Sequence, residues 1–294
     1  MTHAYQILSE RQRDIGGFSV GRLLPTAEVR TVGPFIFVDH MGPAIVGPHH
    51  FVDVDQHPHI GLATLTYLMQ GEIFHKDSLG SEQRITPGAV NWMVAGRGVT
   101  HTERTPQELR SGQHVVHGYQ FWVALPTHLE EMMPDFHHTD AADVPAWTSG
   151  GMDFRLIAGS GFGYTSPVPV QSELFLIELQ TTDAATLDIK NELFGECGLC
   201  VVEGQVQIGT SLLNQGEMLI GPAQEIGSMT LSESTHLLVL GGTPFHEKRF
   251  IHWNFVSSHL NAIKAAVARW QANEFPKVPN DTTYVPIPRL VLRE

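Results

Sequence analysis

Two pairs of residues of types that commonly bind metals occur in the sequence with the same spacing. His57 and His59 lie in "DQHPHIGLATLTYLMQGE", and His101 and Glu103 lie in "GRGVTHTERTP". In a β-strand, residues i and i+2 point to the same face, so both members of each pair project together. A turn at Gly71 and a second turn at "TPG" separate the pairs and allow the chain to run out and return. The spacing therefore predicts that three imidazole nitrogens and one carboxylate oxygen converge.

Imidazole and carboxylate ligands suit one divalent first-row metal. Such a set holds Fe(II), Mn, Ni, Cu(II) or Zn and leaves coordination positions for water, O₂ or a substrate. It resembles the two-His-one-carboxylate site of non-haem iron oxygenases, with one additional histidine. A single H-x-H pair is weak evidence, since such a pair also occurs in cores and on surfaces. Two in-phase pairs beside apolar segments favour a metal site, although the ligands alone do not select the metal.

The segments that must position these residues read as strands. Short apolar stretches bounded by Gly or Pro recur along the chain, among them "GPFIFVDHMGP", "ATLTYLMQGEI", "HGYQFWVALP", "GLCVVEGQVQIG" and "THLLVLGG". Many short strands at near-even spacing are typical of an all-β sandwich or barrel. One exception is "SSHLNAIKAAVARWQANEF", whose apolar residues recur at spacings of three and four. This pattern predicts a helix near residues 257–274.

A weak internal repeat divides the chain. "YLMQGEI" at Gly71 is similar to "VVEGQVQ" at Gly204, and "ITPGAVNWMVAG" at Gly88 is similar to "LNQGEMLIGPA" at Gly216. The offsets are nearly equal, which indicates two copies of one all-β unit. The polar stretch "PDFHHTDAADVPAWTSGG" predicts the boundary, with an N-terminal metal-binding domain over residues 1–139 and a C-terminal domain over 140–294 that includes the helix.

The second copy serves as an internal control for the metal-ligand prediction. Counting the same distances from Gly204 and Gly216 places Lys190, Glu192, Met229 and Leu231 where the first copy has its four candidate ligands. The second copy therefore lacks the ligands. Because a unit of this kind folds without the histidines, we infer that the first copy keeps them for function.

Composition narrows the choice of partners. Asp and Glu number 31 against 18 Lys and Arg, and no basic cluster occurs, so we expect no direct binding to nucleic acid. The sequence shows no signal peptide and no apolar run long enough to cross a bilayer, so we expect no membrane association and a cytoplasmic location. The only cysteines, Cys197 and Cys200, precede a strand and turn, which favours a buried structural role over a redox or zinc site.

The quoted motifs together resemble the pirin family of the cupin superfamily. The block from His57 to Glu103 carries most of the resemblance, and "WNFVSS", "FPKVP" and "YVPIP" are similar to the pirin C-terminus. The resemblance implies a bicupin, with two antiparallel jelly-roll β-barrels packed face to face and a C-terminal helix. It implies one metal, usually iron, on His57, His59, His101 and Glu103. Many other cupins have a Glu where this chain has Ala63 or Thr64, so Glu103 supplies the acid instead.

The resemblance leaves more than one activity open. Bacterial pirins are commonly assigned quercetin 2,3-dioxygenase activity, which implies a flavonol and O₂ as substrates and Glu103 as the catalytic base. Some eukaryotic pirins are non-catalytic iron proteins that bind transcription regulators, so a redox-sensing protein with a protein partner is the alternative. An isomerase using the same metal is a third. His40, His75 and His117 lie near the motifs as candidates for contacts to the ligands, and they are not included in the predicted site. No residues for a further cofactor are predicted.

Overall fold

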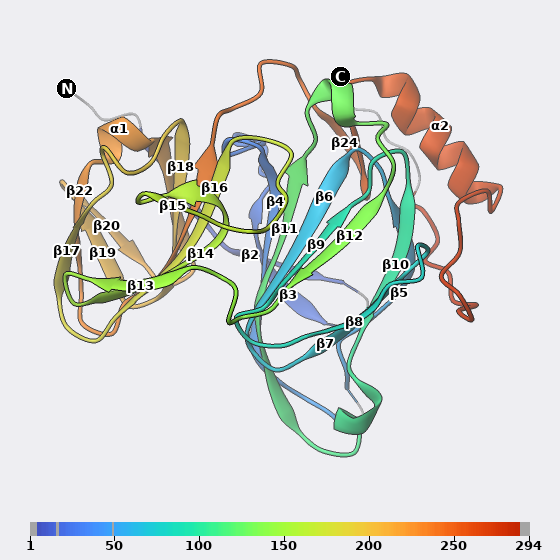
Figure 1. The fold of residues 1–294 in the computed structure, drawn as a ribbon, viewed down its shortest axis with the longest axis horizontal. Helices are drawn as coiled ribbons and strands as arrows, with labels where there is room; N and C mark the ends of the chain where they lie inside the picture. The colour runs from blue at the N-terminus through green and yellow to red at the C-terminus, as the bar shows by residue number, and fades with distance from the viewer. Residues whose placement is uncertain (1–4, 16–17, 49, 289–294) are drawn as a thin grey trace. The chain divides into compact units, whose positions relative to one another are not determined.

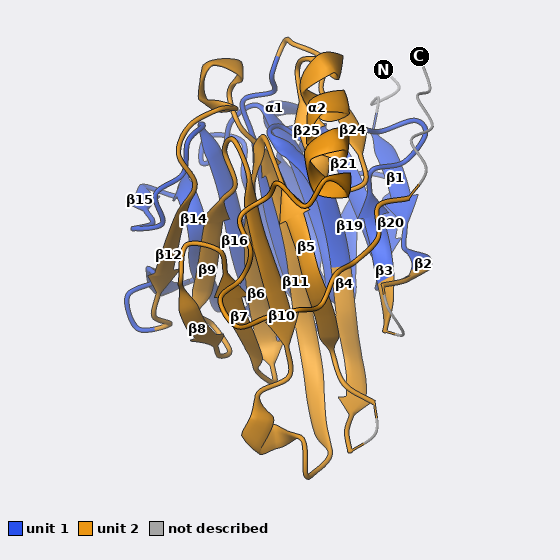
Figure 2. Cartoon of the chain, turned by 90° about the vertical axis from the view of Figure 1, so that its right-hand side faces the viewer, with its two compact units in different colours: residues 1–12, 21–39, 142–245 blue, residues 13–20, 40–141, 246–294 orange. Residues whose placement is uncertain are grey.

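The computed structural model describes residues 5–15, 18–48 and 50–288, and it divides the chain into two compact units (Figure 2). Unit 1 comprises residues 1–12, 21–39 and 142–245, and unit 2 comprises residues 13–20, 40–141 and 246–294. Three strands contain points where the chain passes between units, namely β2 (Arg11–Asp14), β3 (Ser19–Leu24) and β4 (Phe35–Val46).

Unit 2 contains the segments that carry the predicted ligands. A four-stranded antiparallel sheet has the order β5-β10-β7-β8, and a second sheet, which continues beyond β4 into β3 and β2, has the order β12-β9-β6-β11-β4-β3-β2 (Figure 1). The strands are β5 (Asp53–His59), β6 (Leu62–Gln70), β7 (Ile73–Asp77), β8 (Glu82–Ile85), β9 (Val90–Val94), β10 (Val99–Arg104), β11 (His114–Ala124) and β12 (Asp135–Thr139), with the short pair β24 (Phe250–His252) and β25 (Phe255–Ser257). Two 3₁₀ turns, Gln107–Leu109 and Thr127–Leu129, follow β10 and β11.

Unit 1 is built from the same kind of sheets. One has the order β1-β21-β18-β23-β16-β14-β13, with β15 paired to β14, and the other has the order β17-β22-β19-β20. The strands are β1 (Gln6–Ser9), β13 (Ala146–Ser149), β14 (Met152–Gly161), β15 (Tyr164–Thr165), β16 (Leu174–Thr181), β17 (Ala185–Asp188), β18 (Glu196–Glu203), β19 (Gln205–Ile208), β20 (Ser211–Asn214), β21 (Glu217–Pro222), β22 (Ser228–Leu231) and β23 (His236–Gly242). One helical turn, α1 (Ala223–Ile226), follows β21.

The repeat seen in the sequence corresponds to matching turns. Gly71 joins β6 to β7 at φ +82°, and Gly204 joins β18 to β19 at φ +79°. A Cβ at Gly71 would lie 2.4 Å from the carbonyl oxygen of Val115, so both the left-handed backbone and the close approach require glycine there. Antiparallel pairing in the sheets of both units, together with a helix near the C-terminus, confirms the predicted all-β bicupin class.

Helix α2 (Leu260–Gln271) is shorter than the predicted span of 257–274. Its buried face contains Ile263, Val267 and Trp270, and these side chains pack with Phe255 and Phe275. All of them belong to unit 2, so the helix forms part of the compact unit that holds residues 40–141 rather than the one that holds residues 142–245. The division into domains 1–139 and 140–294 stays a prediction, and the compact units interleave along the chain.

Both cysteines are buried on β18. Burial raises the pKa of the Cys197 thiol far above its ordinary value, so this residue stays an uncharged apolar side chain. Among the described residues, no helix is both long and apolar enough to cross a membrane.

Candidate metal centre

Strand β10 brings the two predicted pairs together because it lies between β5 and β7. Its antiparallel pairing with β5 places His101 opposite His57 and Val99 opposite His59. Its pairing with β7 places His101 opposite Asp77 and Glu103 opposite His75. The chain therefore runs out and returns as the turn residues predicted. Imidazoles from two adjacent strands, β5 and β10, share one face of the sheet.

The three histidines form a compact buried cluster. His57, His59 and His101 are 7%, 1% and 0% exposed. The Nε2 atoms of His59 and His101 lie 3.1 Å apart, and the ring centroids of His57 and His101 lie 4.3 Å apart. One ligand nitrogen from each of the three residues lies within 4.8 Å of the other two. This arrangement can present three nitrogens to one ion.

Glu103 reaches the cluster through His101. One of its carboxylate oxygens lies within 4.8 Å of ligand nitrogens of His101 and His75, so it belongs to a second group that shares His101 with the first. The Thr66 hydroxyl donates to Glu103 Oε1 at 2.9 Å, and Gln120 Oε1 lies 2.8 Å from the same hydroxyl oxygen. Burial raises the pKa of the Glu103 carboxyl, while His75 and the Thr66 hydroxyl act in the opposite direction.

Burial also keeps the imidazoles uncharged. Desolvation lowers the pKa of His57 to about 4, although its hydrogen bond to the Asp55 backbone favours the charged form. The pKa values of His59 and His101 lie well below the ordinary value, first because of burial and then because of the neighbouring histidines. Neutral imidazoles have a free lone pair at neutral pH, which is the form that binds a metal.

Hydrogen bonds select which nitrogen of His57 and His101 carries that lone pair. His57 Nδ1 lies 2.7 Å from the backbone oxygen of Asp55 and donates to it, which leaves Nε2 as the acceptor. His75 Nε2 donates to the Asp77 carboxylate at 3.1 Å, so His75 Nδ1 accepts from His101 Nδ1 at 3.4 Å. His101 Nε2 is then also free to bind. Carboxylate–histidine chains of this kind commonly orient metal ligands.

Sequence reasoning left His75 out of the site and did not consider Asp77. Asp77 is fully buried. Burial alone would raise the pKa of its carboxyl, but hydrogen bonds from His75 and from the backbone of Ser81 and Leu79 outweigh burial and lower it. The stretch "HKD" has the same i, i+2 spacing as the two ligand pairs and is the signal that could have revealed it. His40 and His117 were the other two candidates for contacts to the ligands. Their Nε2 atoms lie 2.9 Å from each other.

The geometry of the cluster fits a bound cation. Two nitrogen ligands at right angles, each about 2.1 Å from a cation, lie about 3.0 Å apart, and the 3.1 Å between His59 Nε2 and His101 Nε2 agrees with that distance. The donors are neutral imidazoles and a carboxylate, which suit a divalent first-row metal. This donor set does not decide which metal binds.

Two antiparallel β units, one of them with a histidine–carboxylate cluster able to hold a metal, define a bicupin. A sequence model of the pirin family matches residues 17–123, and a model of the pirin C-terminal cupin domain matches residues 176–276. A pirin-like protein of Caulobacter vibrioides is 43% identical over 96% of this chain and 98% of its own length. The chain therefore belongs to the pirin family.

Solved structures agree with this assignment. A quercetin 2,3-dioxygenase from Acinetobacter baumannii is 30% identical, with a TM-score of 0.90 over 99% of this chain and 97% of its own. A bacterial pirin of Escherichia coli, YhhW, solved in complex with nickel(II), is 16% identical, with a TM-score of 0.64 over 82% of this chain and all of its own. At that identity the second likeness supports the fold alone.

Proposed function

We propose that the protein is a metal-dependent dioxygenase acting on flavonols of the quercetin type. One divalent ion, Fe(II), would be held by His57, His59, His101 and Glu103. The observation that carries the proposal is the convergence of three buried, neutral histidines beside a carboxylate. The chain that carries them is 30% identical over 99% of its length to a quercetin 2,3-dioxygenase.

The metal, when bound, supplies Lewis-acid chemistry that lowers the pKa of the 3-hydroxyl of a flavonol. Glu103 is the candidate general base for that proton, and its carboxylate would leave the ion to accept it. Its raised pKa increases its basicity, and the Thr66 hydroxyl fixes one of its oxygens. One atom of O₂ would then be added to each of C2 and C4 of the flavonol, the C2–C3 and C3–C4 bonds would break, and C3 would leave with its own oxygen as carbon monoxide.

Neighbouring rings restrict the orientation of the imidazoles. Trp122 lies edge-on to His59 with centroids 5.1 Å apart, and Phe136 stacks on His75 at 4.6 Å. These contacts hold the planes of the His59 and His75 rings, so the two imidazoles need to move little when a metal and a substrate bind. His57 is oriented by its hydrogen bond to the Asp55 backbone oxygen. The role proposed for His57 and His59 is to bind the ion, whereas Glu103 would accept the proton.

The test is a single-substrate assay with defined metal content. The purified protein is loaded with Fe(II), incubated with quercetin without oxygen and then exposed to air, and flavonol absorbance and carbon monoxide are measured. We expect many turnovers with stoichiometric carbon monoxide, and none for His101→Ala. Tight metal binding without loss of flavonol for Fe, Mn, Ni and Cu would reject the dioxygenase and favour the redox-sensing alternative.

A further inference from the structure

The pairing of β5 with β10 is interrupted next to two of the proposed ligands. His101 lies opposite His57, but Glu103 lies opposite Val54, so two residues of β5, Asp55 and Gln56, face the single residue Thr102. A bulge of this kind takes backbone groups out of the ladder and redirects the neighbouring side chains. It also places the Asp55 carbonyl where His57 Nδ1 donates to it.

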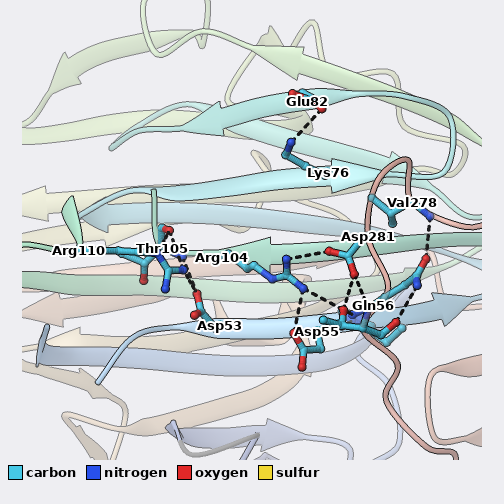
Figure 3. A network of polar contacts seen from close by, with 12 residues as sticks. Asp53, Asp55, Gln56, Lys76, Glu82, Arg104, Thr105, Arg110, Val278 and Asp281 are labelled. Carbon is cyan, nitrogen blue, oxygen red and sulfur yellow. Dashed lines mark hydrogen bonds and ion pairs between the residues drawn. The ribbon is translucent and has the colours of Figure 1, made fainter. Parts of the chain in front are cut away.

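The C-terminal strap, which we define as residues 276–288, satisfies the polar groups of Gln56 at this bulge (Figure 3). The Gln56 backbone N–H donates to Thr283 Oγ1 at 3.1 Å, and its carbonyl accepts from the Val285 N–H at 3.0 Å. Its side-chain oxygen accepts from the Val278 N–H at 2.7 Å, and its side-chain amide donates to the Thr283 carbonyl at 2.8 Å. Both the backbone and the side chain of Gln56 are thus bonded to the strap.

The strap also binds β10 through Arg104, the residue after Glu103. Arg104 forms an ion pair with Asp281 at 2.7 Å and donates to Thr283 Oγ1 at 2.9 Å. The same guanidinium lies 2.9 Å from the Asp55 carboxylate. Figure 3 shows Asp281 of the strap gathered with Asp55 and Gln56 of β5 and Arg104 of β10. The strap therefore joins the two strands that carry the proposed ligands.

Thr283 is the centre of this network. Its hydroxyl accepts from the Gln56 N–H and from Arg104, and it donates to Asp281 Oδ1 at 2.5 Å. Along residues 281–288 partly buried and exposed side chains alternate, as in a strand lying against the sheet. Helix α2 anchors the far end, because Trp270 Nε1 donates to the Val285 carbonyl at 3.0 Å and the Trp270 ring stacks on Tyr284.

We propose that the strap is a positioning element of the metal centre, with Gln56, Arg104 and Thr283 as its positioning residues. The strap holds the bulge at residues 55–56, and the bulge sets the hydrogen bond that orients His57. The proposal depends on the metal site of the proposed function, but not on the identity of the substrate. Partners that orient metal ligands typically contribute about 10–100-fold to metal affinity.

The test compares Thr283→Val with Thr283→Ser in the full-length protein. Valine keeps the shape of threonine but removes the hydroxyl, whereas serine keeps the hydroxyl. Ni²⁺ affinity is measured by competition with a chelator, and hydrogen exchange is measured at the Gln56 amide. We expect Thr283→Val to bind Ni²⁺ about 10-fold more weakly, with faster exchange at Gln56, and Thr283→Ser to stay within about two-fold of the wild type.

A matched control and a second variant complete the experiment. Glu82→Gln removes the ion pair with Lys76, which joins β7 to β8 in the same sheet without contacting the strap (Figure 3). We expect this control to keep wild-type Ni²⁺ affinity. Asp281→Asn keeps its side-chain size and tests the Arg104 contact if Thr283→Val does not fold, and we expect it to bind Ni²⁺ more weakly than the wild type.

Wild-type Ni²⁺ affinity in Thr283→Val, or in Asp281→Asn if the valine variant does not fold, would overturn the proposal. Equal weakening in Glu82→Gln would also overturn it, because the effect would then be a general one of sheet stability. If the wild type binds Ni²⁺ but does not consume quercetin, only the proposed dioxygenase activity fails, and the affinity ratios still decide the role of the strap. A wild-type protein that binds neither Ni²⁺ nor Fe(II) would overturn both.

Discussion

The β5–β10 pair of unit 2 and the β17–β22 pair of unit 1 occupy equivalent places in the two repeats. In unit 2, His101 lies opposite His57. In unit 1, Met229 lies opposite Leu187, and both are buried in the apolar core of that unit. One strand pair thus brings imidazoles together where the other brings together aliphatic side chains.

The strand pairing corrects part of the alignment obtained by counting residues. Counting from Gly204 placed Lys190 and Glu192 at the positions of His57 and His59, but the residue opposite Met229 is Leu187. The loop before β18 differs in length from its counterpart before β6, so equal counting distances do not give equal positions. At Leu187 and at Ile189, two residues further along, unit 1 has a buried aliphatic side chain.

The comparison shows that a strand pair at this place in the repeat can form without histidine, as β17 and β22 do. Burying a leucine or methionine side chain contributes about 1.5–3 kcal/mol to folding. Burying a polar ring costs free energy unless hydrogen bonds or a metal satisfy it. Unit 2 therefore has a costlier arrangement in the same architecture, which is the physical argument that its histidines serve a function.

The sharpest way to break the comparison is to remove one residue at the equivalent position in each unit. We expect His101→Ala to weaken metal binding by more than about 100-fold, beyond the 10–100-fold typical of residues that only support the ligands. We expect Met229→Ala to keep full metal content and to lower the free energy of unfolding by about 2–5 kcal/mol, because it leaves a cavity. Elemental analysis after dialysis and chemical denaturation measure the two effects.

A wild-type metal content in His101→Ala would contradict the assignment of this residue as a ligand. Loss of metal in a folded Met229→Ala variant would contradict the purely structural role assigned to Met229. Circular dichroism of each variant shows whether the fold is retained before the metal is measured.

Local spacing in the sequence predicted that the candidate ligands lie close together in pairs. A period of two places His57 with His59 and His101 with Glu103 whatever the rest of the fold, and turn residues indicated that the strands return. It did not predict the role of Asp77, because that depends on β7 lying on the other side of β10. Nor did it predict that Asp55 and Gln56 form a bulge, which depends on the register between two strands.

The helix illustrates the same limit. Its apolar periodicity is local, so the sequence located it to within a few residues. Its membership of unit 2 depends on Phe255 and Phe275 packing against the face formed by Ile263 and Trp270. Contacts between residues far apart in the chain leave no local pattern in the sequence, and the internal repeat did not indicate them either.

Converting one strand pair into the other would sharpen the comparison. The double variant His57→Leu/His101→Met gives β5–β10 the residues of β17–β22, and we expect it to bind no metal and to resist acid better than the metal-free wild type. Because the pKa of folded His57 is about 4 against an ordinary 6.5, the unfolded chain binds more protons between these values. Stability of the metal-free wild type therefore falls as the pH falls through this window.

The loss attributable to His57 is about 3 kcal/mol by pH 4, since each unit of pKa shift corresponds to about 1.4 kcal/mol. Urea denaturation of the metal-free proteins at pH 7, 6, 5 and 4 measures it. If the double variant shows the same pH dependence of stability as the wild type, the buried histidines are not the cause of that dependence.

The chain from Asp77 through His75 to His101 has no equivalent in the aliphatic pair, and we expect it to affect affinity rather than stoichiometry. His75→Ala and Asp77→Asn should each weaken metal binding by about 10–100-fold, because His101 then loses the partner that fixes its Nδ1 proton. The protein should still bind one metal ion at saturation. Chelator competition measures the affinity, and similar affinity in all three proteins would show that the chain does not position His101.

The smallest expected effect belongs to Thr66, which faces Glu103 from the second sheet. Thr66→Val keeps the side-chain shape but removes the hydrogen bond that favours the charged carboxylate, so the pKa of Glu103 should rise further. A hydrogen bond of about 1 kcal/mol corresponds to about a five-fold loss of metal affinity. The lower pH limit of metal binding should move upward, since the carboxylate must lose its proton to bind. A Thr66→Ser variant should restore the wild-type pH profile, and the same upward shift in Thr66→Ser would assign the effect to packing instead of the hydroxyl.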